Sequence, residues 1–174
     1  MQGCPSSLIG DGPVTLSEGL QKLVSEHAPL RNRLETLFSL CNKVEVEENK
    51  EVPFEELIHE VKIFSTKLEF HSVREENYLF RMMEVYIGKS GGPIAVMEYE
   101  HEQANGFISE FLKNSESTHQ TTDSLIKNSS LIKNAYYTLL DHFSKEEQVL
   151  YPMAERMFTQ EEKEEFNLKV SQIQ

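Results

Sequence analysis

The sequence predicts an all-α protein, an antiparallel up-down-up-down four-helix bundle followed by a short C-terminal helix. Four long segments repeat apolar residues at alternating steps of three and four, which is the spacing of one buried helix face. Polar segments separate these stretches, and no segment alternates apolar and polar residues as a half-buried strand would. Short connections of this kind favour antiparallel neighbours.

Apolar periodicity places the four long helices at residues 15–44, 53–87, 93–114 and 124–158. The apolar stripe expected in the core includes Tyr78 and Met82 in the second helix and Val149 in the fourth. Glycine and proline are frequent before the first of them, and a shorter polar helix follows the last. The expected organisation is therefore a flexible leader at 1–14, a bundle at 15–158 and a C-terminal helical tail at 159–174.

Two prolines and one capping motif modify these helices. Pro29 removes a backbone donor and is expected to kink the first helix near His27. Pro152 is expected to bend or loosen the last turns of the fourth helix. Thr159 and Glu162 have the spacing of a capping box, which predicts the start of the C-terminal helix.

The composition indicates one soluble domain and argues against several kinds of partner. The 174 residues carry a formal net charge of -12, which disfavours nucleic acid and anionic membrane surfaces. No apolar run could span a bilayer and the N-terminus lacks a signal-peptide pattern, so we expect a cytoplasmic protein without a membrane partner. Cys4 and Cys41 form no CxxC pair, and Cys41 is expected in the core.

A histidine interrupts each of the four apolar stripes near its middle. These histidines are His27, His71, His101 and His142. Glu75 follows His71 by four residues, and Glu146 follows His142 by four, so each pair shares one helix face. The sequence therefore predicts a cluster of imidazoles and carboxylates inside the bundle.

Carboxylates buried in this way need compensation. An unpaired buried carboxylate costs several kcal/mol or neutralises itself, whereas cations between the glutamates would remove that cost. Residues 71–84 and 142–155 match in register as an internal repeat, which predicts two equivalent half-sites and an oxo- or hydroxo-bridged dinuclear centre with an open position. Mixed imidazole and carboxylate ligands suit iron, with manganese and zinc as competitors.

Each of these residues also has a purely structural interpretation. A single buried histidine is usually a hydrogen-bonded core residue, and two adjacent glutamates on a helix are usually solvated. Four histidines on four stripes, two of them with glutamate at the same spacing, favour the metal site. Glu76 and Glu147 are expected around the site or at the surface, with Asn105 as a further candidate acceptor for the histidines. His59 and His119 are interpreted as non-ligands.

Two motifs carry a family resemblance. They are His71-x-x-x-Glu75-Glu76-x-x-Leu79-Phe80 and His142-Phe-x-x-Glu146-Glu147-x-x-Leu150-Tyr151-Pro152. They resemble the repeated signature of the haemerythrin-like family, also called HHE cation-binding domains, over about residues 15–158. The resemblance implies a haemerythrin-like bundle that binds two iron ions through His27, His71, Glu75, His101, His142 and Glu146.

Within that family the chain looks more like the di-iron proteins for repair of iron centres than like the oxygen carriers. Oxygen carriers have a second histidine on the third helix, one turn after the first, and Asn105 stands at that place here. Residues 92–102 resemble the corresponding helix of the repair proteins. Those proteins commonly carry an additional N-terminal module with cysteines, which the segment 1–14 with its Cys4 does not match.

Three functions are compatible with these features. The resemblance implies a di-iron protein that protects or repairs iron–sulfur clusters under nitric oxide or oxidative stress, with iron–sulfur proteins and O2, NO or H2O2 as partners. The alternative is a module that binds or senses oxygen, nitric oxide or iron without turnover. A structural bundle with zinc or without metal is the third, and it predicts that His71→Ala leaves stability unchanged or improved.

Overall fold

The computed structural model describes residues 13–117 and 120–172, which contain helices and no strand, so the all-α class is confirmed. Two π-helical segments, η2 (Glu75–Leu79) and η3 (Glu146–Leu150), are inserted between α-helices. The α-helices are α1 (Glu18–Val46), α2 (Glu51–Arg74), α3 (Phe80–Ile87), α4 (Pro93–Ser115), α5 (Thr122–Lys145), α6 (Tyr151–Met157) and α7 (Gln160–Gln172).

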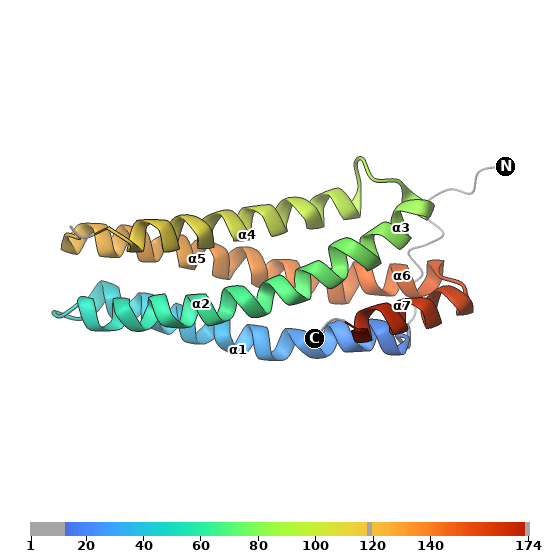
Figure 1. Ribbon diagram of the computed structural model, residues 1–174, viewed down its shortest axis with the longest axis horizontal. Coiled ribbons are helices and arrows are strands. Elements are labelled where there is room, and N and C mark those ends of the chain that lie inside the picture. The colour runs from blue at the N-terminus through green and yellow to red at the C-terminus, as the bar shows by residue number, and fades with distance from the viewer. Residues whose placement is uncertain (1–12, 118–119, 173–174) are drawn as a thin grey trace.

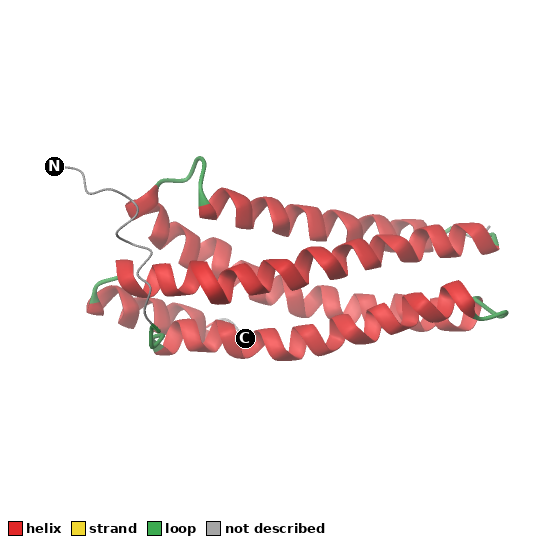
Figure 2. Ribbon diagram, turned by 180° about the vertical axis from the view of Figure 1, so that it is seen from behind, coloured by secondary structure: helices red, strands yellow, loops and turns green. Residues whose placement is uncertain are grey.

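Four helical columns run along the long axis of the molecule (Figure 1). They are α1, α2 with η2 and α3, α4, and α5 with η3 and α6. Contacts join α1 to α2, α2 to α4, α4 to α5 and α5 to α1, which closes a ring around a shared interior. The loops between successive columns lie at alternating ends, and α7 packs back against α1. The view from behind shows the same arrangement (Figure 2).

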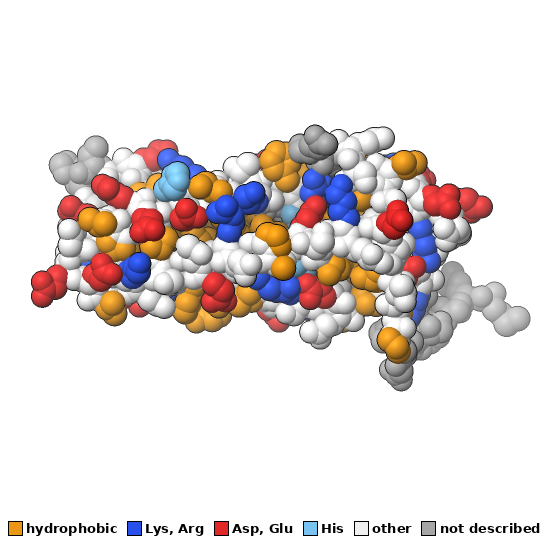
Figure 3. Space-filling view, turned by 90° about the horizontal axis from the view of Figure 1, so that it is seen from below, with side chains coloured by type: hydrophobic (Ala, Val, Ile, Leu, Met, Phe, Trp, Pro, Cys, Tyr) orange, Lys and Arg blue, Asp and Glu red, His pale blue; other side chains and the backbone are white. Residues whose placement is uncertain are grey.

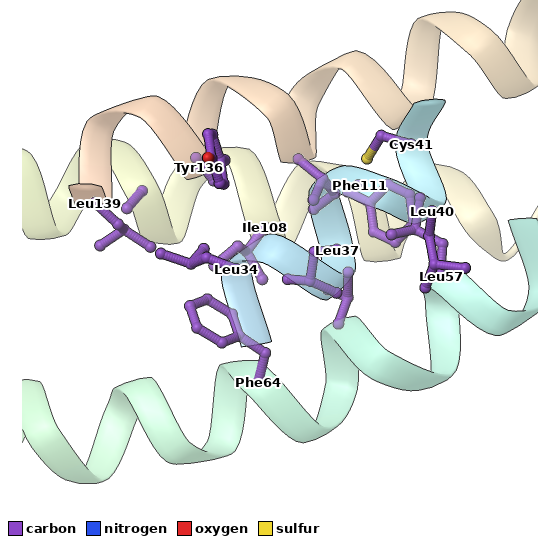
Figure 4. Packing of buried hydrophobic residues seen from close by; sticks show 14 of the residues in the cluster. Leu34, Leu37, Leu40, Cys41, Leu57, Phe64, Ile108, Phe111, Tyr136 and Leu139 are labelled. Carbon is purple, nitrogen blue, oxygen red and sulfur yellow. The ribbon is translucent and has the colours of Figure 1, made fainter. Parts of the chain in front are cut away.

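The interior consists of two apolar clusters with a polar layer between them. In the first cluster, Leu34, Phe64 and Ile108 point toward one another from three different columns (Figure 4). The second cluster lies toward α3, α6 and α7 and is filled by the side chains of residues such as Leu20, Met83, Leu150 and Phe166. Each column therefore passes from one cluster to the other through a short segment that carries a buried histidine.

The two π-helical segments begin at the two glutamates of the predicted site. The N–H of Phe80 donates to the carbonyl of Glu75, five residues earlier, and the N–H of Tyr151 donates to the carbonyl of Glu146. A π turn accommodates more residues than an α turn, so the helix after it is rotated relative to an uninterrupted α-helix. The expected single helices at 53–87 and 124–158 are thus each interrupted at the site.

This rotation makes part of the predicted apolar stripe wrong. The stripe placed Tyr78, Met82 and Val149 in the core, but Val149 is 47% exposed and the other two are only partly buried. The residues buried instead are their next neighbours, Leu79, Met83 and Leu150. The physical reason is the widened turn, which moves every following side chain by about one position.

The helix ends follow the sequence signals more closely. The predicted capping box is confirmed, because Thr159 N–H donates to Glu162 Oε2 at 2.8 Å and Glu162 N–H donates to Thr159 Oγ1 at 3.2 Å. α1 continues as one helix through Pro29, so the kink expected there stays a prediction. Pro152 lies in the first turn of α6, directly after η3. Its missing backbone N–H removes no α-helical hydrogen bond at that position.

The remaining expectations concern the two cysteines, His59 and His119, the leader and membrane insertion. Cys41 is buried as expected, and its thiol donates to the carbonyl of Ser129 at 3.4 Å. His59 is exposed. Cys4, His119 and most of the expected leader lie outside the described residues. Among the described residues, every helix is too short or too polar to cross a lipid bilayer.

Candidate metal centre

The six residues singled out in the sequence come together in the polar layer, and all four columns contribute. They are His27 from α1, His71 from α2, Glu75 from η2, His101 from α4, His142 from α5 and Glu146 from η3. Their exposed fractions lie between 0% and 3%. The i, i+4 spacing brings each pair together, with His71 Nε2 3.5 Å from Glu75 Oε2 and His142 Nε2 2.9 Å from Glu146 Oε1.

Their nitrogen and oxygen atoms form two groups that share one carboxylate. In each group the contributing atoms lie within 4.8 Å of one another. The first group is Glu75, His101, His142 and Glu146, and the second is His27, His71 and Glu146. Oε1 of Glu146 lies 2.9 Å from His142 Nε2, and Oε2 lies 3.2 Å from His27 Nε2. Glu146 therefore belongs to both groups and would be the residue that two metal ions could share.

Several of these buried atoms have no hydrogen-bond partner. They are both carboxylate oxygens of Glu146, Oε2 of Glu75, and Nε2 of His101 and His142. His27 Nε2 and His71 Nε2 also face each other at 3.2 Å. Buried polar atoms are normally satisfied, and converging lone pairs are unfavourable without a proton or cation between them. Metal ions would satisfy nitrogen and oxygen lone pairs together, so the donor set fits them.

Four more glutamates fix the orientation of the imidazoles, and we call them the outer carboxylates. Each accepts a hydrogen bond from Nδ1 of one histidine, which turns Nε2 of that histidine toward the centre. The pairs are His27 with Glu147 at 2.7 Å, His71 with Glu26 at 2.8 Å, His101 with Glu76 at 2.7 Å and His142 with Glu100 at 3.0 Å.

The outer carboxylates link the columns in a closed circuit. Each stands next to a ligand in the sequence but holds a histidine of another column; Glu26, for example, precedes His27 and holds His71. The four bonds join η3 with α1, α1 with α2, η2 with α4, and α4 with α5, and the first-named element in each case carries the accepting carboxylate. Three basic residues form ion pairs with outer carboxylates, namely Arg31 with Glu147, Arg74 with Glu26 and Lys145 with Glu100. Lys and Arg side chains are visible beside Asp and Glu near the middle of one face (Figure 3).

Sequence reasoning found only part of this outer layer. Glu76 and Glu147 were expected around the site, whereas Glu26 and Glu100 were missed, although each directly precedes a histidine. The expectation for Asn105 is wrong, because this residue is exposed. Its helix turns the small side chain of Ala104 toward the interior instead, where it is 1% exposed.

Tyr151 is a further residue of the centre that the sequence did not reveal. It is fully buried, and its hydroxyl donates to Glu75 Oε1 at 2.6 Å while lying 3.2 Å from His27 Nε2. Burial and the carboxylate of Glu146 raise the pKa of Tyr151 well above its ordinary value, so the hydroxyl keeps its proton. The internal repeat contained a signal, since Tyr151 occupies the position that matches Phe80.

The protein environment shifts the pKa values of three of the histidines, and not all in the same direction. Burial and the neighbouring His71 lower the pKa of His27 to about 4, and burial and His101 lower the pKa of His142 to about 4. Burial alone would lower the pKa of His101, but Glu75 and Glu76 raise it to about 9. His27 and His142 are thus neutral at neutral pH, as a metal ligand must be.

The two inner carboxylates are divided in the same manner. Burial alone would raise the pKa of Glu75, but His71 and His101 hold it well below its usual range. Burial and the charge of Glu75 raise the pKa of Glu146 well above its ordinary value. Without metal the pair retains a proton that a bound cation would displace.

Comparison with known proteins places this arrangement in a family. The family model described as "Hemerythrin HHE cation binding domain" matches residues 18–154, which include all six clustered residues. The chain belongs to this haemerythrin HHE family. The family resemblance of the two motifs is therefore confirmed, and cation binding is the property that the description of the family states.

One curated relative of this haemerythrin HHE chain has a named role. The chain is 29% identical over 137 residues to the iron–sulfur cluster repair protein YtfE of Escherichia coli O157:H7. The match covers 76% of this chain and 62% of that protein, so the chain matches less than two thirds of its relative's length. No solved structure matches the chain.

Proposed function

We propose that this chain is a non-haem di-iron protein with an open-sided, carboxylate-bridged site. The observation that carries the proposal is the convergence of partnerless nitrogen and oxygen atoms in two groups that share Glu146. The two iron ions would be held by His27, His71, Glu75, His101, His142 and Glu146.

When bound, the two iron ions supply redox chemistry and a binding position for a small ligand such as O2, NO or H2O2. The chain's own residues hold and orient this centre. Glu75 and Glu146 offset the positive charge of the metals, and the outer carboxylates keep each imidazole directed inward. The apolar clusters on both sides exclude bulk water, which strengthens every electrostatic contact within the layer.

We further propose that the protein protects or repairs iron–sulfur clusters under nitric oxide or oxidative stress. The similarity to the repair protein of Escherichia coli supports this role, as does the mixed imidazole and carboxylate donor set. The same proposal includes a cytoplasmic location and partners that are iron–sulfur proteins, with neither nucleic acid nor membrane bound. The net charge of -12 supports the absence of anionic partners.

The proposal also includes the architecture implied by the family. Residues 15–158 would form an antiparallel up-down-up-down four-helix bundle, with a flexible leader at 1–14 and a helical tail at 159–174. The alternating positions of the loops in Figure 1 and the closed ring of contacts between columns support this arrangement.

Metal analysis of protein from iron-replete cells tests the di-iron centre. We expect about two irons per chain, as the two groups sharing Glu146 imply, together with the visible absorption of an oxo-bridged pair. Glu75→Ala and Glu146→Ala should each reduce both the iron content and the absorption to near zero. Glu56→Ala, at an exposed position of α2, is the matched control and should retain both. Zinc or manganese in place of iron, or iron that survives both site substitutions, would contradict the proposal.

Reconstitution of a damaged enzyme tests the repair role. An enzyme whose [4Fe–4S] cluster has been destroyed by nitric oxide should regain activity with the iron-loaded protein and not with the metal-free protein. Glu146→Ala should behave as the metal-free protein does, because its iron is lost. Equal restoration by metal-free protein would rule out repair by this centre.

Deep burial favours one alternative, a module that binds or senses oxygen, nitric oxide or iron without turnover. The six residues are at most 3% exposed, so a cluster held by another protein could not touch them, whereas a small molecule could diffuse in. Stopped-flow mixing of the reduced protein with O2 or NO separates the two functions. A long-lived adduct that dissociates reversibly would support sensing, and rapid irreversible oxidation would oppose it.

A further inference from the structure

Methionine is distributed unevenly between the two apolar clusters. All five methionines of the described residues lie in the second cluster or pack against it, namely Met82, Met83, Met97, Met153 and Met157. The first cluster and the side chains packed against it include none. Methionine often fills irregular gaps in a core, but that use gives no reason for one cluster to hold every thioether and the other none.

The second cluster borders the metal centre through two aromatic rings. The ring of Phe80 lies 5.8 Å from that of His101, and the ring of Tyr151 lies 5.7 Å from that of His27. Phe80 and Tyr151 both belong to this cluster, together with the buried methionines. An oxidant that leaves the centre on this side therefore meets side chains packed among thioethers.

Two of the methionines follow the inner faces of α4 and α3 away from the centre. Met97 precedes His101 by four residues on α4, so the two side chains share one face and lie one turn apart. Met83 follows Phe80 by three residues on α3, which again places both on one face. Met83 is 0% exposed and Met97 is 4% exposed, so oxidants in bulk solvent have little direct access to either sulfur.

The cysteine of the described residues lies on the other side of the centre and is unreactive. Cys41 belongs to the first cluster, and burial raises the pKa of its thiol to about 12. Because the thiolate is the reactive form of cysteine, this side chain stays inert at neutral pH. A thioether needs no ionisation to be oxidised. Among the described residues, the oxidisable sulfur beside the centre is therefore that of methionine.

We propose that Met83 and Met97 are modification sites, which are oxidised to methionine sulfoxide when hydrogen peroxide reacts at the metal centre and which thereby spare the histidine ligands. In this step the O–O bond of the peroxide breaks, one oxygen atom bonds to the methionine sulfur, and the other leaves as water. The sulfur supplies the two electrons that reduce the peroxide, so the metal ions end in the oxidation state in which they began. Sulfoxide reductases reverse the modification. This inference rests on the proposed di-iron centre and identifies the side chains that its oxidant modifies.

Peptide mass spectrometry after treatment with hydrogen peroxide tests the proposal. The full-length protein is treated in three forms, namely loaded with iron(II), loaded with zinc and metal-free, each after removal of unbound metal. Trypsin cleaves after Lys and Arg, which separates the methionines of the second cluster into peptides 82–89, 90–113, 146–156 and 157–163. N-acetylmethionine added to each solution reports oxidation by free peroxide.

The iron-loaded protein should differ from the other two forms. Met83 and Met97 should be converted to the sulfoxide about tenfold faster or more, because the reacting peroxide is held near them. The added N-acetylmethionine should be oxidised at one low rate in all three solutions. Zinc occupies the same ligands without redox chemistry, so the zinc-loaded form separates the effect of iron from that of a filled site.

Two variants test whether the thioethers spare the ligands. Met97→Leu removes the sulfur one turn from His101 and nearly conserves side-chain volume. It should increase the fraction of His101 that gains an oxygen atom in the iron-loaded protein, and peptide 90–113 reports both residues in one spectrum. Met157→Leu, 11 residues after Glu146, is the matched control and should leave oxidation of His101 at the wild-type level.

The outcomes distinguish this inference from the proposed function. Metal analysis of the same samples shows whether iron is bound, and a chain that takes up no iron would contradict the di-iron centre itself. Iron-loaded protein whose Met83 and Met97 are oxidised no faster than in the zinc-loaded form would refute the inference and leave the centre intact. Equal oxidation of His101 in the wild type and in Met97→Leu would show that the thioether does not spare that ligand. The comparison of metal forms needs only wild-type protein, so it decides the matter even if a variant does not fold.

Discussion

The two ring nitrogens of each buried histidine face different surroundings. Nδ1 donates to an outer carboxylate at 2.7–3.0 Å, and Nε2 faces the other inner side chains. Because the carboxylate selects the tautomer, the neutral imidazoles of His27 and His142 present a lone pair to the centre before any metal arrives. Preorganisation of this kind reduces the ordering that metal binding must impose on the chain.

At the scale of residues, we predict that the metal-free protein is most stable near pH 6.5. Below that value, the unfolded chain binds a proton at His27 and at His142, whose folded pKa values are about 4 against 6.5 when unperturbed. Glu146 opposes them, because its raised pKa lets the folded state hold a proton that the unfolded state loses. The two histidines outweigh the one carboxylate, so stability should fall as the pH is lowered from about 6.5 toward 4.

Above pH 6.5 the sign reverses. His101 has a folded pKa of about 9, so the folded state retains a proton there that the unfolded state has lost, and its stabilising effect disappears as the pH rises through 9. Urea unfolding of metal-free protein at about pH 5, 6.5 and 8.5 measures both slopes. Stability that rises continuously to pH 8.5 would be incompatible with these charges. Bound metal should abolish the maximum, because ligation requires neutral imidazoles.

Among the structural elements, the helices were predictable and their π-helical interruptions were not. Apolar periodicity located all four columns because each buries one continuous face. It could not detect η2 or η3, because the residue before each buried position is apolar as well. Either Tyr78 or Leu79 could fill one core position, and either Val149 or Leu150 could fill the other. Only packing against the other columns decides between such neighbours.

The candidate site was likewise predictable only in part. His71 and Glu75 were predictable because a polar pair on an apolar stripe is visible within one helix. The outer carboxylate Glu26 and the hydroxyl of Tyr151 act across helices, so their roles depend on the rotation of each column, which the sequence of one helix does not contain. The metal-ligating role of the six residues stays a prediction until metal is measured.

The contact between α1 and α7 gives a prediction at the scale of elements. A Cβ atom added to Gly19 would lie 2.7 Å from Phe166 Cδ1 and 3.1 Å from the backbone of Asn167. Gly19→Ala should therefore push α7 away and lower the free energy of unfolding by about 1–3 kcal/mol, as overpacking does. Urea unfolding measures the loss, and limited proteolysis should show earlier cleavage within α7.

The matched control is the helical glycine of α4. An added Cβ at Gly106 meets nothing within 4 Å, so Gly106→Ala should instead stabilise the protein by about 0.5–1 kcal/mol. If both substitutions stabilised the protein equally, the close approach of α7 to α1 would not constrain the fold.

For the whole molecule, the polar layer is the part of the interior that contains buried polar atoms without partners and that receives side chains from all four columns. It separates two apolar clusters, and its inner side chains come from all four columns. Without metal, buried polar atoms there lack partners, which destabilises the layer relative to the clusters beside it. With metal, the same atoms would join every column to the others.

We therefore predict that metal stabilises the molecule as a unit. Iron(II) at a thousand times its dissociation constant should raise the free energy of unfolding by roughly 4 kcal/mol for each ion bound. Hydrogen exchange should slow in α1, α2, α4 and α5 alike, and chelation should reverse the effect. Protection confined to α5 and η3 would contradict a centre shared by the four columns. Glu146→Ala should abolish the gain, whereas Glu56→Ala, on the surface, should retain it.

The closed circuit of outer carboxylates has a consequence during synthesis on the ribosome. His27 is the first of the six to emerge, yet the carboxylate that orients it, Glu147, is translated 120 residues later. The nascent chain therefore carries incomplete and misaligned half-sites until the last column appears. Iron encountered on the way finds no finished coordination sphere, so capture of the metal is postponed until the chain can enclose it.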